Sequence, residues 1–214
     1  MIFKLNIKLC LAGLLLGIAA VGSAGVYEDM LHAINNDDER TVAQLLQRGV
    51  DVNSVDANGE SLLMLAVKHG RPKMVKLVLD ARPRINARNA YGESALMLAA
   101  IQGHTEIVRQ LLSLGAEVNH PGWTPLSYAA ARNRQDIARL LIGRGANVNT
   151  ASDNGVTPLM MAAREGHLQM VLLLMEHGAD PNIESRDGDT ALGLARAQGH
   201  REIAEMLMRA GARD

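Results

Sequence analysis

The sequence predicts an all-α repeat solenoid of about six helix–turn–helix–hairpin units, with the first and last units acting as caps. The first observation is a row of glycines separated by 33, 30, 33 and 33 residues: Gly59, Gly92, Gly122, Gly155 and Gly188. The second is a phrase that recurs later in each unit, as in Gly115-Ala-Glu-Val-Asn119, Gly145-Ala-Asn-Val-Asn149 and Gly178-Ala-Asp-Pro-Asn182. A fixed period of this length is typical of stacked repeat proteins.

The third copy shows how one unit is built. Ser94 can cap a helix over residues 95–101, and Gly103 can end that helix in a left-handed turn. A second helix is expected near residues 106–114, with four apolar side chains on one face: Ile107, Val108, Leu111 and Leu112. Neither helix can bury its apolar face alone, so neighbouring units must stack to form a core.

The repeat domain is expected to cover residues 25–214, preceded by a secretory signal peptide over residues 1–24. Lys4 and Lys8 form a positive start, residues 9–20 are uncharged and apolar, and Gly22-Ser23-Ala24 offers a cleavage site. The protein is therefore expected to be exported to the periplasm, without a cysteine after cleavage. An alternative is an uncleaved membrane anchor over residues 9–26. The units are expected at approximately 26–58, 59–91, 92–121, 122–154, 155–187 and 188–214.

Composition and charge bear on the partner class. Hydrophobic residues form 48% of the chain but aromatic residues only 2%, and such small aliphatic side chains suit closely stacked helices. The net charge of −1 gives no overall field that would recruit nucleic acid.

Charge is uneven along the stack, because residues 28–60 are rich in acids and residues 68–88 are rich in bases. These two segments can attract each other across adjacent repeats. Alternatively, Lys68, Arg71 and Arg88 form a docking patch that steers an acidic partner.

Several motifs closely resemble the ankyrin repeat over roughly residues 26–214. They are Thr124-Pro125-Leu126, Thr157-Pro158-Leu159, Gly103-His104, Gly166-His167, Gly199-His200 and Glu106-Ile107-Val108. The resemblance implies an ankyrin solenoid that acts as a non-catalytic protein-binding module.

The chain departs from the ankyrin pattern in three ways. The histidine that follows Thr-Pro-Leu in the family is replaced at every copy, by Met64, Met97, Ser127, Met160 and Gly193. Arg82-Pro83 stands where Gly-Ala is usual, which puts a non-glycine residue in a left-handed position at a cost of roughly 1 kcal/mol. The fourth copy has lost three residues between Asn119 and Gly122, which predicts a short hairpin there.

No catalytic motif is present, so we expect no enzyme activity, no cofactor and no metal site. The expected partner is another protein and not nucleic acid, membrane contact is expected only if the N-terminal segment is uncleaved, and the expected state is a monomer. The partner is expected to be a co-exported enzyme that the chain inhibits or assists. Two alternatives are a scaffold tethered to the inner membrane by its N-terminal segment, and a metal-handling or antioxidant role for the methionines.

The expected contact surface is the concave helix face together with the hairpin tips. One variable position per unit gives a row that is mostly apolar: His32, Leu65, Leu98, Tyr128, Met161 and Leu194. Tyr91 and Trp123 fall at or near the hairpins beside this row. Exposed apolar rows and aromatic anchors are typical of binding sites. Packing of neighbouring units over the same side chains is the competing interpretation.

Overall fold

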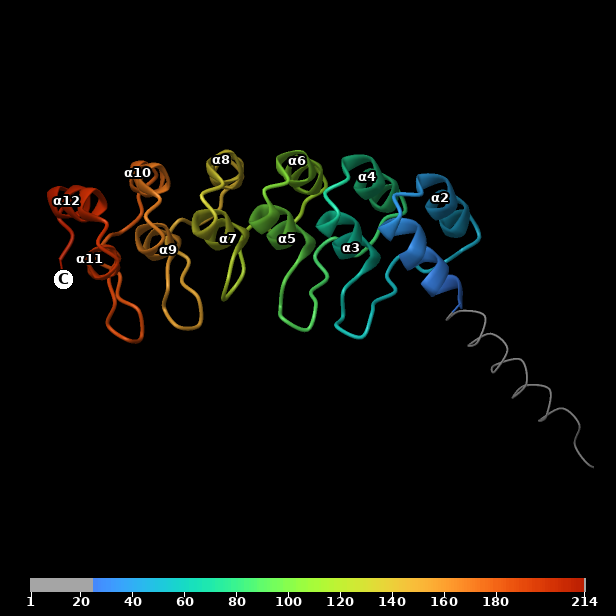
Figure 1. The fold of residues 1–214 in the computed structure, drawn as a ribbon, viewed down its shortest axis with the longest axis horizontal. Helices are drawn as coiled ribbons and strands as arrows, with labels where there is room; N and C mark the ends of the chain where they lie inside the picture. The colour runs from blue at the N-terminus through green and yellow to red at the C-terminus, as the bar shows by residue number, and fades with distance from the viewer. Residues whose placement is uncertain (1–24, 214) are drawn as a thin grey trace, which may run out of the picture.

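The computed structural model describes residues 25–213, so the expected signal peptide lies outside the described residues. Six helix pairs stack in one row, with an inner and an outer helix in each pair (Figure 1). Residues 25–35 are helical and form the first inner helix. The other inner helices are α3 (Leu62–Lys68), α5 (Ala95–Gln102), α7 (Pro125–Ala131), α9 (Pro158–Arg164) and α11 (Ala191–Ala197). The outer helices are α2 (Glu39–Gln47), α4 (Pro72–Asp80), α6 (Thr105–Ser113), α8 (Gln135–Ile142), α10 (Leu168–Glu176) and α12 (Arg201–Arg209).

A hydroxyl residue begins each inner helix from α3 onwards. Its side chain accepts a hydrogen bond from the backbone N–H three residues later, which satisfies a donor that the helix leaves free. These caps are Ser61, Ser94, Thr124, Thr157 and Thr190. Gly103 ends α5 with φ +85°, so both predicted caps of that helix are confirmed, and the helix runs one residue further than expected, to Gln102. The second helix of the same unit starts and ends one residue earlier than expected.

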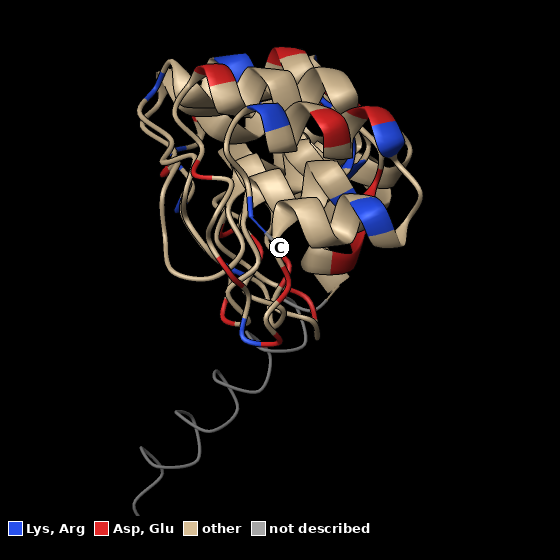
Figure 2. Ribbon diagram, turned by 90° about the vertical axis from the view of Figure 1, so that its left-hand side faces the viewer, with Lys and Arg blue, Asp and Glu red and all other residues tan. Residues whose placement is uncertain are grey.

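The core lies between the inner and outer rows and runs the length of the stack. The four apolar residues predicted to share one face of α6 are all buried, at 0 to 6% exposure. Each inner helix from α5 to α9 contacts the inner helix on either side of it, and the outer helices form a second row of contacts. Figure 2 shows charged residues on the outer helices, at places on the inner helices and in the hairpins, with the rest of the helix ribbons free of charge. This distribution is expected when neither helix of a unit can bury its apolar face alone.

Five hairpin loops, called fingers below, project from the base of the stack between successive units (Figure 1). They comprise residues 51–60, 84–93, 117–123, 147–156 and 180–189. The third finger is visibly the shortest, which confirms the prediction from the missing three residues.

A ladder of asparagines fixes the spacing of the units at the base of the fingers. The side-chain oxygen of each accepts a hydrogen bond from a backbone N–H of the next unit, at 2.7 to 3.0 Å. The members of this asparagine ladder are Asn53, Asn86, Asn119, Asn149 and Asn182. The ladder continues through the short third finger, because Asn119 accepts from Asn147 at 2.8 Å.

Two departures from the ankyrin pattern have direct structural outcomes. Arg82 adopts φ +56°, as predicted for a residue standing in place of glycine. At the missing histidine position, the sulfur atoms of Met97 and Met160 lie 3.4 Å from the backbone nitrogens of Ser94 and Thr157. These methionines therefore fill the core and also accept the N–H group at the start of their helices.

Candidate protein-binding surface

Three of the four aromatic residues in the described chain lie at the second and third fingers and the start of α7. Tyr91 is at the tip of the second finger and is 75% exposed, and Trp123 on the third finger is 38% exposed. The ring of Trp123 packs against the half-buried Tyr128 of α7, with centroids 5.4 Å apart and a tilt of 37° between the rings. We call Tyr91, Trp123 and Tyr128 the aromatic cluster because they lie on neighbouring fingers and the adjoining helix; the ring contact that the structure gives is between Trp123 and Tyr128.

The short third finger interrupts the row of fingers at this cluster. The first and second fingers are joined by a hydrogen bond from the backbone of Ala90 to Asn58, at 2.8 Å. The fourth and fifth are joined in the same way from Arg186 to Asn154, at 2.9 Å. Within residues 25–213, no backbone hydrogen bond joins residues 120–123 to either neighbouring finger. The aromatic cluster therefore lies where two paired sets of fingers are separated.

A half-buried carboxylate, Glu93, lies beside the aromatic cluster. It accepts a hydrogen bond from the Tyr128 hydroxyl at 3.2 Å and another from the Asn89 amide at 3.0 Å. Burial first, and then the negative charge of Glu93 and its hydrogen bond, raise the pKa of Tyr128 to about 12. Tyr128 is thus a neutral donor near neutral pH, held in place by Glu93 on one side and by Trp123 on the other.

The concave apolar row is only partly exposed, which corrects the expectation from the sequence. Leu98 and Met161 are each just 5% exposed, so they are not available as contact residues. Leu65, Tyr128 and Leu194 are half-buried and pack against the core. The physical reason is that inner helices flank α5 and α9 on both sides and cover their medium-sized side chains. The competing interpretation, packing by neighbouring units, is correct for Leu98 and Met161.

The expected basic guides are all engaged by acids of the chain itself. Lys68 pairs with Glu60, Arg71 lies 3.6 Å from Asp37, and Arg88 lies 3.8 Å from Glu117. The Arg71–Asp37 pair joins adjacent units, as the charge-attraction interpretation predicts. The structure therefore gives no support to these three residues as a free patch for an acidic partner.

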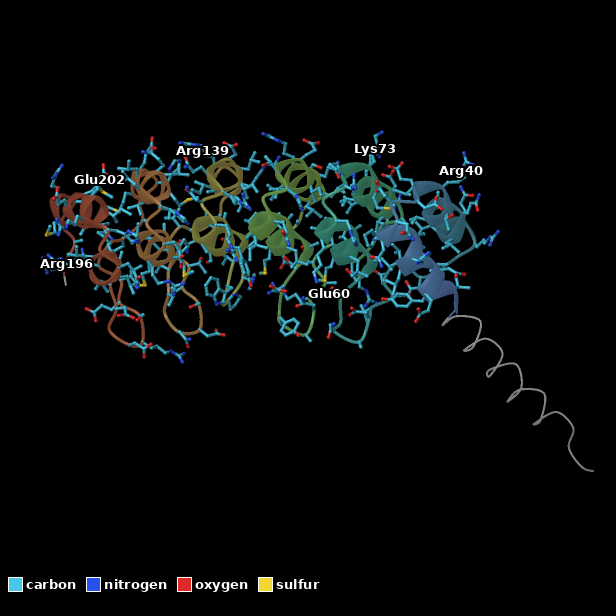
Figure 3. The ribbon with its side chains drawn as sticks, viewed as in Figure 1. Arg40, Glu60, Lys73, Arg139, Arg196 and Glu202 are labelled. Atoms are coloured by element: carbon cyan, nitrogen blue, oxygen red, sulfur yellow. The ribbon has the colours of Figure 1, made fainter. Side chains whose placement is uncertain are left out.

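Other bases of residues 68–88 make no ion pair within the described part of the chain, namely Lys73, Arg82 and Arg84. Lys73 extends from α4 on the outer row, as do Arg40 and Arg139 from α2 and α8 (Figure 3). Lys73 therefore lies on the side of the stack away from the fingers, whereas Arg84 stands at the start of the second finger.

The methionines of the fifth unit and the histidines His167 and His200 of the fifth and sixth units make contacts within the fold. Met160 and Met170 belong to the core and are at most 1% exposed. His167 and His200 each reach the preceding unit, where they contact the carbonyl oxygens of Ala131 and Arg164 at 3.2 and 3.0 Å. Within residues 25–213, no group of three or more His, Cys, Asp or Glu side chains is placed to hold a metal ion.

The membrane-anchor alternative concerns residues 9–26, which lie almost wholly outside the described chain. Among the residues that are described, no helix has both the length and the apolar character needed to cross a membrane.

The aromatic cluster and Glu93 come from different units, and only part of this arrangement is readable from the sequence. Tyr91, Trp123 and the missing three residues were all recognisable signals. Glu93 was missed as a site residue, although its position directly after Gly92 and before the helix cap repeats that of Glu60.

Comparison with known families gives one clear match. A family model described as "Ankyrin repeats (3 copies)" matches residues 30–121, 84–152, 110–185 and 126–213. Together these overlapping matches extend through all six helix pairs. A search of curated proteins finds no match.

Proposed function

The chain belongs to the ankyrin-repeat family, and from this premise we propose that it binds a partner protein at the aromatic cluster. Ankyrin repeats are protein–protein interaction modules that generally carry no catalytic activity. The observation that supports this site is the packing of Trp123 against Tyr128 at the break in the finger row, with the exposed Tyr91 on the neighbouring finger. Aromatic side chains of this kind are enriched among the residues that dominate binding energy.

The surroundings of the cluster favour binding with little loss of conformational freedom. The Tyr128 hydroxyl is held by Glu93, and the Trp123 ring packs on Tyr128. The base of each finger is fixed to the next by the asparagine ladder. A surface that is already ordered loses less entropy when a partner binds, so more of the contact energy appears as affinity.

The proposed setting is the periplasm, and the proposed partner is an enzyme exported with this protein, which it inhibits or assists. The N-terminal charge and apolar pattern of residues 1–24 supports export. We propose that the protein works as a monomer. The tethered scaffold differs from this proposal in one measurable respect, the N-terminus of the purified protein. Intact-mass analysis showing a chain that begins at Gly25 excludes the tether, whereas a chain that retains residues 1–24 supports it.

Site-specific crosslinking tests the binding surface. A photoreactive amino acid at Tyr91 is expected to capture one specific protein in intact cells, because this side chain is the most exposed member of the cluster. The matched control is the same amino acid at Leu172, an apolar residue of α10 that is 41% exposed on the outer row. Equal capture of the same protein from both positions would show that binding does not use the finger side of the stack.

Trp123→Ala provides the second half of the test. Loss of this ring is expected to reduce capture from Tyr91 by at least about tenfold, since removal of a central aromatic anchor commonly costs about 2 kcal/mol or more. Unchanged capture by this variant would remove Trp123 from the proposed surface.

A further inference from the structure

Glu60 and Glu93 occupy equivalent positions in consecutive units. Each directly follows the finger glycine and directly precedes the serine that caps an inner helix. In the first of these units, the ammonium group of Lys68 donates to the carboxylate of Glu60, which is 7% exposed. Lys68 follows Glu60 by eight residues, and the corresponding residue after Glu93 is Ile101. The chain therefore supplies a cation to one glutamate and an apolar residue at the same place for the other.

Glu93 makes no ion pair within the described residues, and its two hydrogen-bond donors, Tyr128 and Asn89, are neutral. Arg88 of the second finger lies 3.8 Å from Glu117, and its guanidinium group also donates to the carbonyl oxygen of Gly92 at 3.5 Å. Glu93 therefore retains its negative charge without a cation of its own.

A second unpaired carboxylate reaches the other side of the short finger. The oxygen atoms of Asp153, from the fourth finger, lie 3.8 and 3.9 Å from where a Cβ atom on Gly122 would stand. Gly122 directly precedes Trp123, and Asp153 makes no ion pair in the described part of the chain. Trp123, on the third finger, therefore lies between two fingers that each carry an unpaired carboxylate: Glu93 on the second finger and Asp153 on the fourth. The second, third and fourth fingers together carry two arginines, Arg84 and Arg88, against three carboxylates, Glu93, Glu117 and Asp153, so their net charge is −1.

We propose that a lysine or arginine side chain of the partner binds beside Glu93 and against the ring of Trp123. The proposal rests on the proposed function, since it identifies the chemistry of the partner at that same surface. The partner's cation would take the role at Glu93 that Lys68 has at Glu60. A cation over an aromatic face is attracted by the ring, and a carboxylate beside it adds a charge-assisted hydrogen bond. Arginine suits the site best, because its planar group can stack on an aromatic ring and donate to a carboxylate together.

The inference reverses the charge of the partner expected from the sequence. That expectation depended on Lys68, Arg71 and Arg88 being free, and all three are ion-paired. Complementary charge at an interface also selects partners by penalising like charge. A basic protruding side chain is therefore favoured at this surface over an acidic one.

The test can be made without knowing the partner, because Trp123 is the only tryptophan in the chain and reports on its own surroundings. The purified protein is titrated with N-acetyl-arginine amide, and the tryptophan fluorescence is followed. The neutral isostere N-acetyl-citrulline amide serves as the matched probe. We expect a saturable change with the arginine probe and at least about tenfold weaker binding of the citrulline probe, since tenfold corresponds to the loss of one modest ionic contact.

Two variants locate the response. Glu93→Gln keeps an acceptor for the Tyr128 hydroxyl but removes the charge, and it is expected to weaken binding of the arginine probe by about tenfold. Asp189→Asn removes a charge at the equivalent position of the last unit and is expected to leave the titration unchanged. Equal binding of the two probes, no saturable response to arginine, or full binding by Glu93→Gln would each overturn the inference.

This outcome is separable from that of the proposed function. Capture of a partner from Tyr91 without discrimination between the two probes would retain the binding surface and reject the cation. A specific arginine response without any captured partner would retain the cation site and reject the protein-binding proposal.

Discussion

The second and third units place a glutamate at the same point before the inner helix, yet the two carboxylates differ in what neutralises them. Glu60 is buried and paired with Lys68 of its own unit. Glu93 is half-buried and takes neutral donors from Asn89 and from Tyr128 of the following unit. The backbone of the repeat is the same in both cases. The difference comes from the residue eight positions after each glutamate. Lys68 gives Glu60 a cation from its own unit, whereas Ile101 leaves Glu93 free to pair with a cation of the partner.

The largest expected effect comes from removing the cation that pairs with Glu60 in the second unit. Lys68→Ile would leave the carboxylate of Glu60 buried without a cation, which is destabilising because an unpaired buried charge is poorly solvated. We expect a loss of about 2 kcal/mol in the free energy of unfolding, below the range for fully buried pairs because Lys68 is partly exposed. Urea unfolding followed by circular dichroism measures it.

The control for that variant is Lys76→Ile, which breaks the exposed pair of Lys76 with Asp80 on α4. Exposed pairs one helical turn apart contribute about 0.5 kcal/mol or less. Equal losses in the two variants would mean that Glu60 and Lys68 are no more than a surface pair.

The converse change gives Glu93 a cation from its own unit. Ile101→Lys places an ammonium group eight residues after Glu93, as Lys68 stands after Glu60. The internal cation is expected to compete with the arginine probe and to weaken its binding by about tenfold in the fluorescence titration. Ile101→Gln has a similar length without the charge and should keep the wild-type response. A loss of binding in both variants would point to disturbed packing and not to competition.

The hydroxyl of Tyr128 provides a direct measure of the charge at Glu93. The pKa of Tyr128 is raised to about 12 by burial first and by the Glu93 carboxylate second. Glu93→Gln is therefore expected to lower this pKa towards the ordinary value of 10.0, while burial keeps it above that value. Ultraviolet absorbance during alkaline titration, compared with Tyr128→Phe to identify the signal, measures the change.

The sign of the linked stability follows from the same pKa. Because the folded protein holds the Tyr128 proton more tightly than the unfolded chain, the contribution to stability is complete below about pH 10 and is lost as the pH rises through about 12. The Glu93→Gln variant should show a smaller loss over this interval, and an unchanged pKa would show that Glu93 is not ionised beside Tyr128.

The smallest expected effect concerns His104, at the junction of the two compared units. A Cβ atom at Gly70 would stand 2.4 Å from an atom of the His104 ring, so the imidazole lies directly against the turn of the preceding unit. Burial lowers the pKa of His104 below 6.5, and the charge of Arg134 lowers it further. The unfolded chain then binds the proton more readily. The stability contributed by neutral His104 is present above pH 6.5 and is lost as the pH falls towards the lowered pKa.

Thermal unfolding measured from about pH 7.5 down to about pH 5.5 tests this contribution. His104→Gln is expected to unfold with a weaker pH dependence than the wild type over that interval. His32→Gln, at an exposed residue of the first unit, is the comparison variant. A pH dependence that is reduced equally by both substitutions would assign the effect to general charge and not to the junction.

The sequence predicted the features that depend on local chemistry. Ser94 and Gly103 bound α5 as expected because a cap and a left-handed glycine act within a few residues of the chain. Arg82 adopts its left-handed conformation for the same reason, and the missing residues shorten the third finger directly.

The features that the sequence left open depend on contacts between units. Whether Leu98 is exposed depends on how closely the neighbouring inner helices approach, and that spacing is not written in any one unit. The pairing of Arg71 with Asp37 likewise requires the register between adjacent units. The role of Glu93 could have been suspected by aligning it with Glu60 and noting that Ile101 replaces Lys68.

The asparagine ladder makes the alignment of successive units independent of the length of the finger tip between them. Consecutive contacts in the ladder span 31 residues, except that Asn119 and Asn147 are 28 apart, and the bond there is still 2.8 Å long. Three residues were therefore removed from a finger tip without shifting the next unit out of alignment. Loop length at the tips can therefore be varied in a library, while one asparagine per unit keeps the pitch of the scaffold constant.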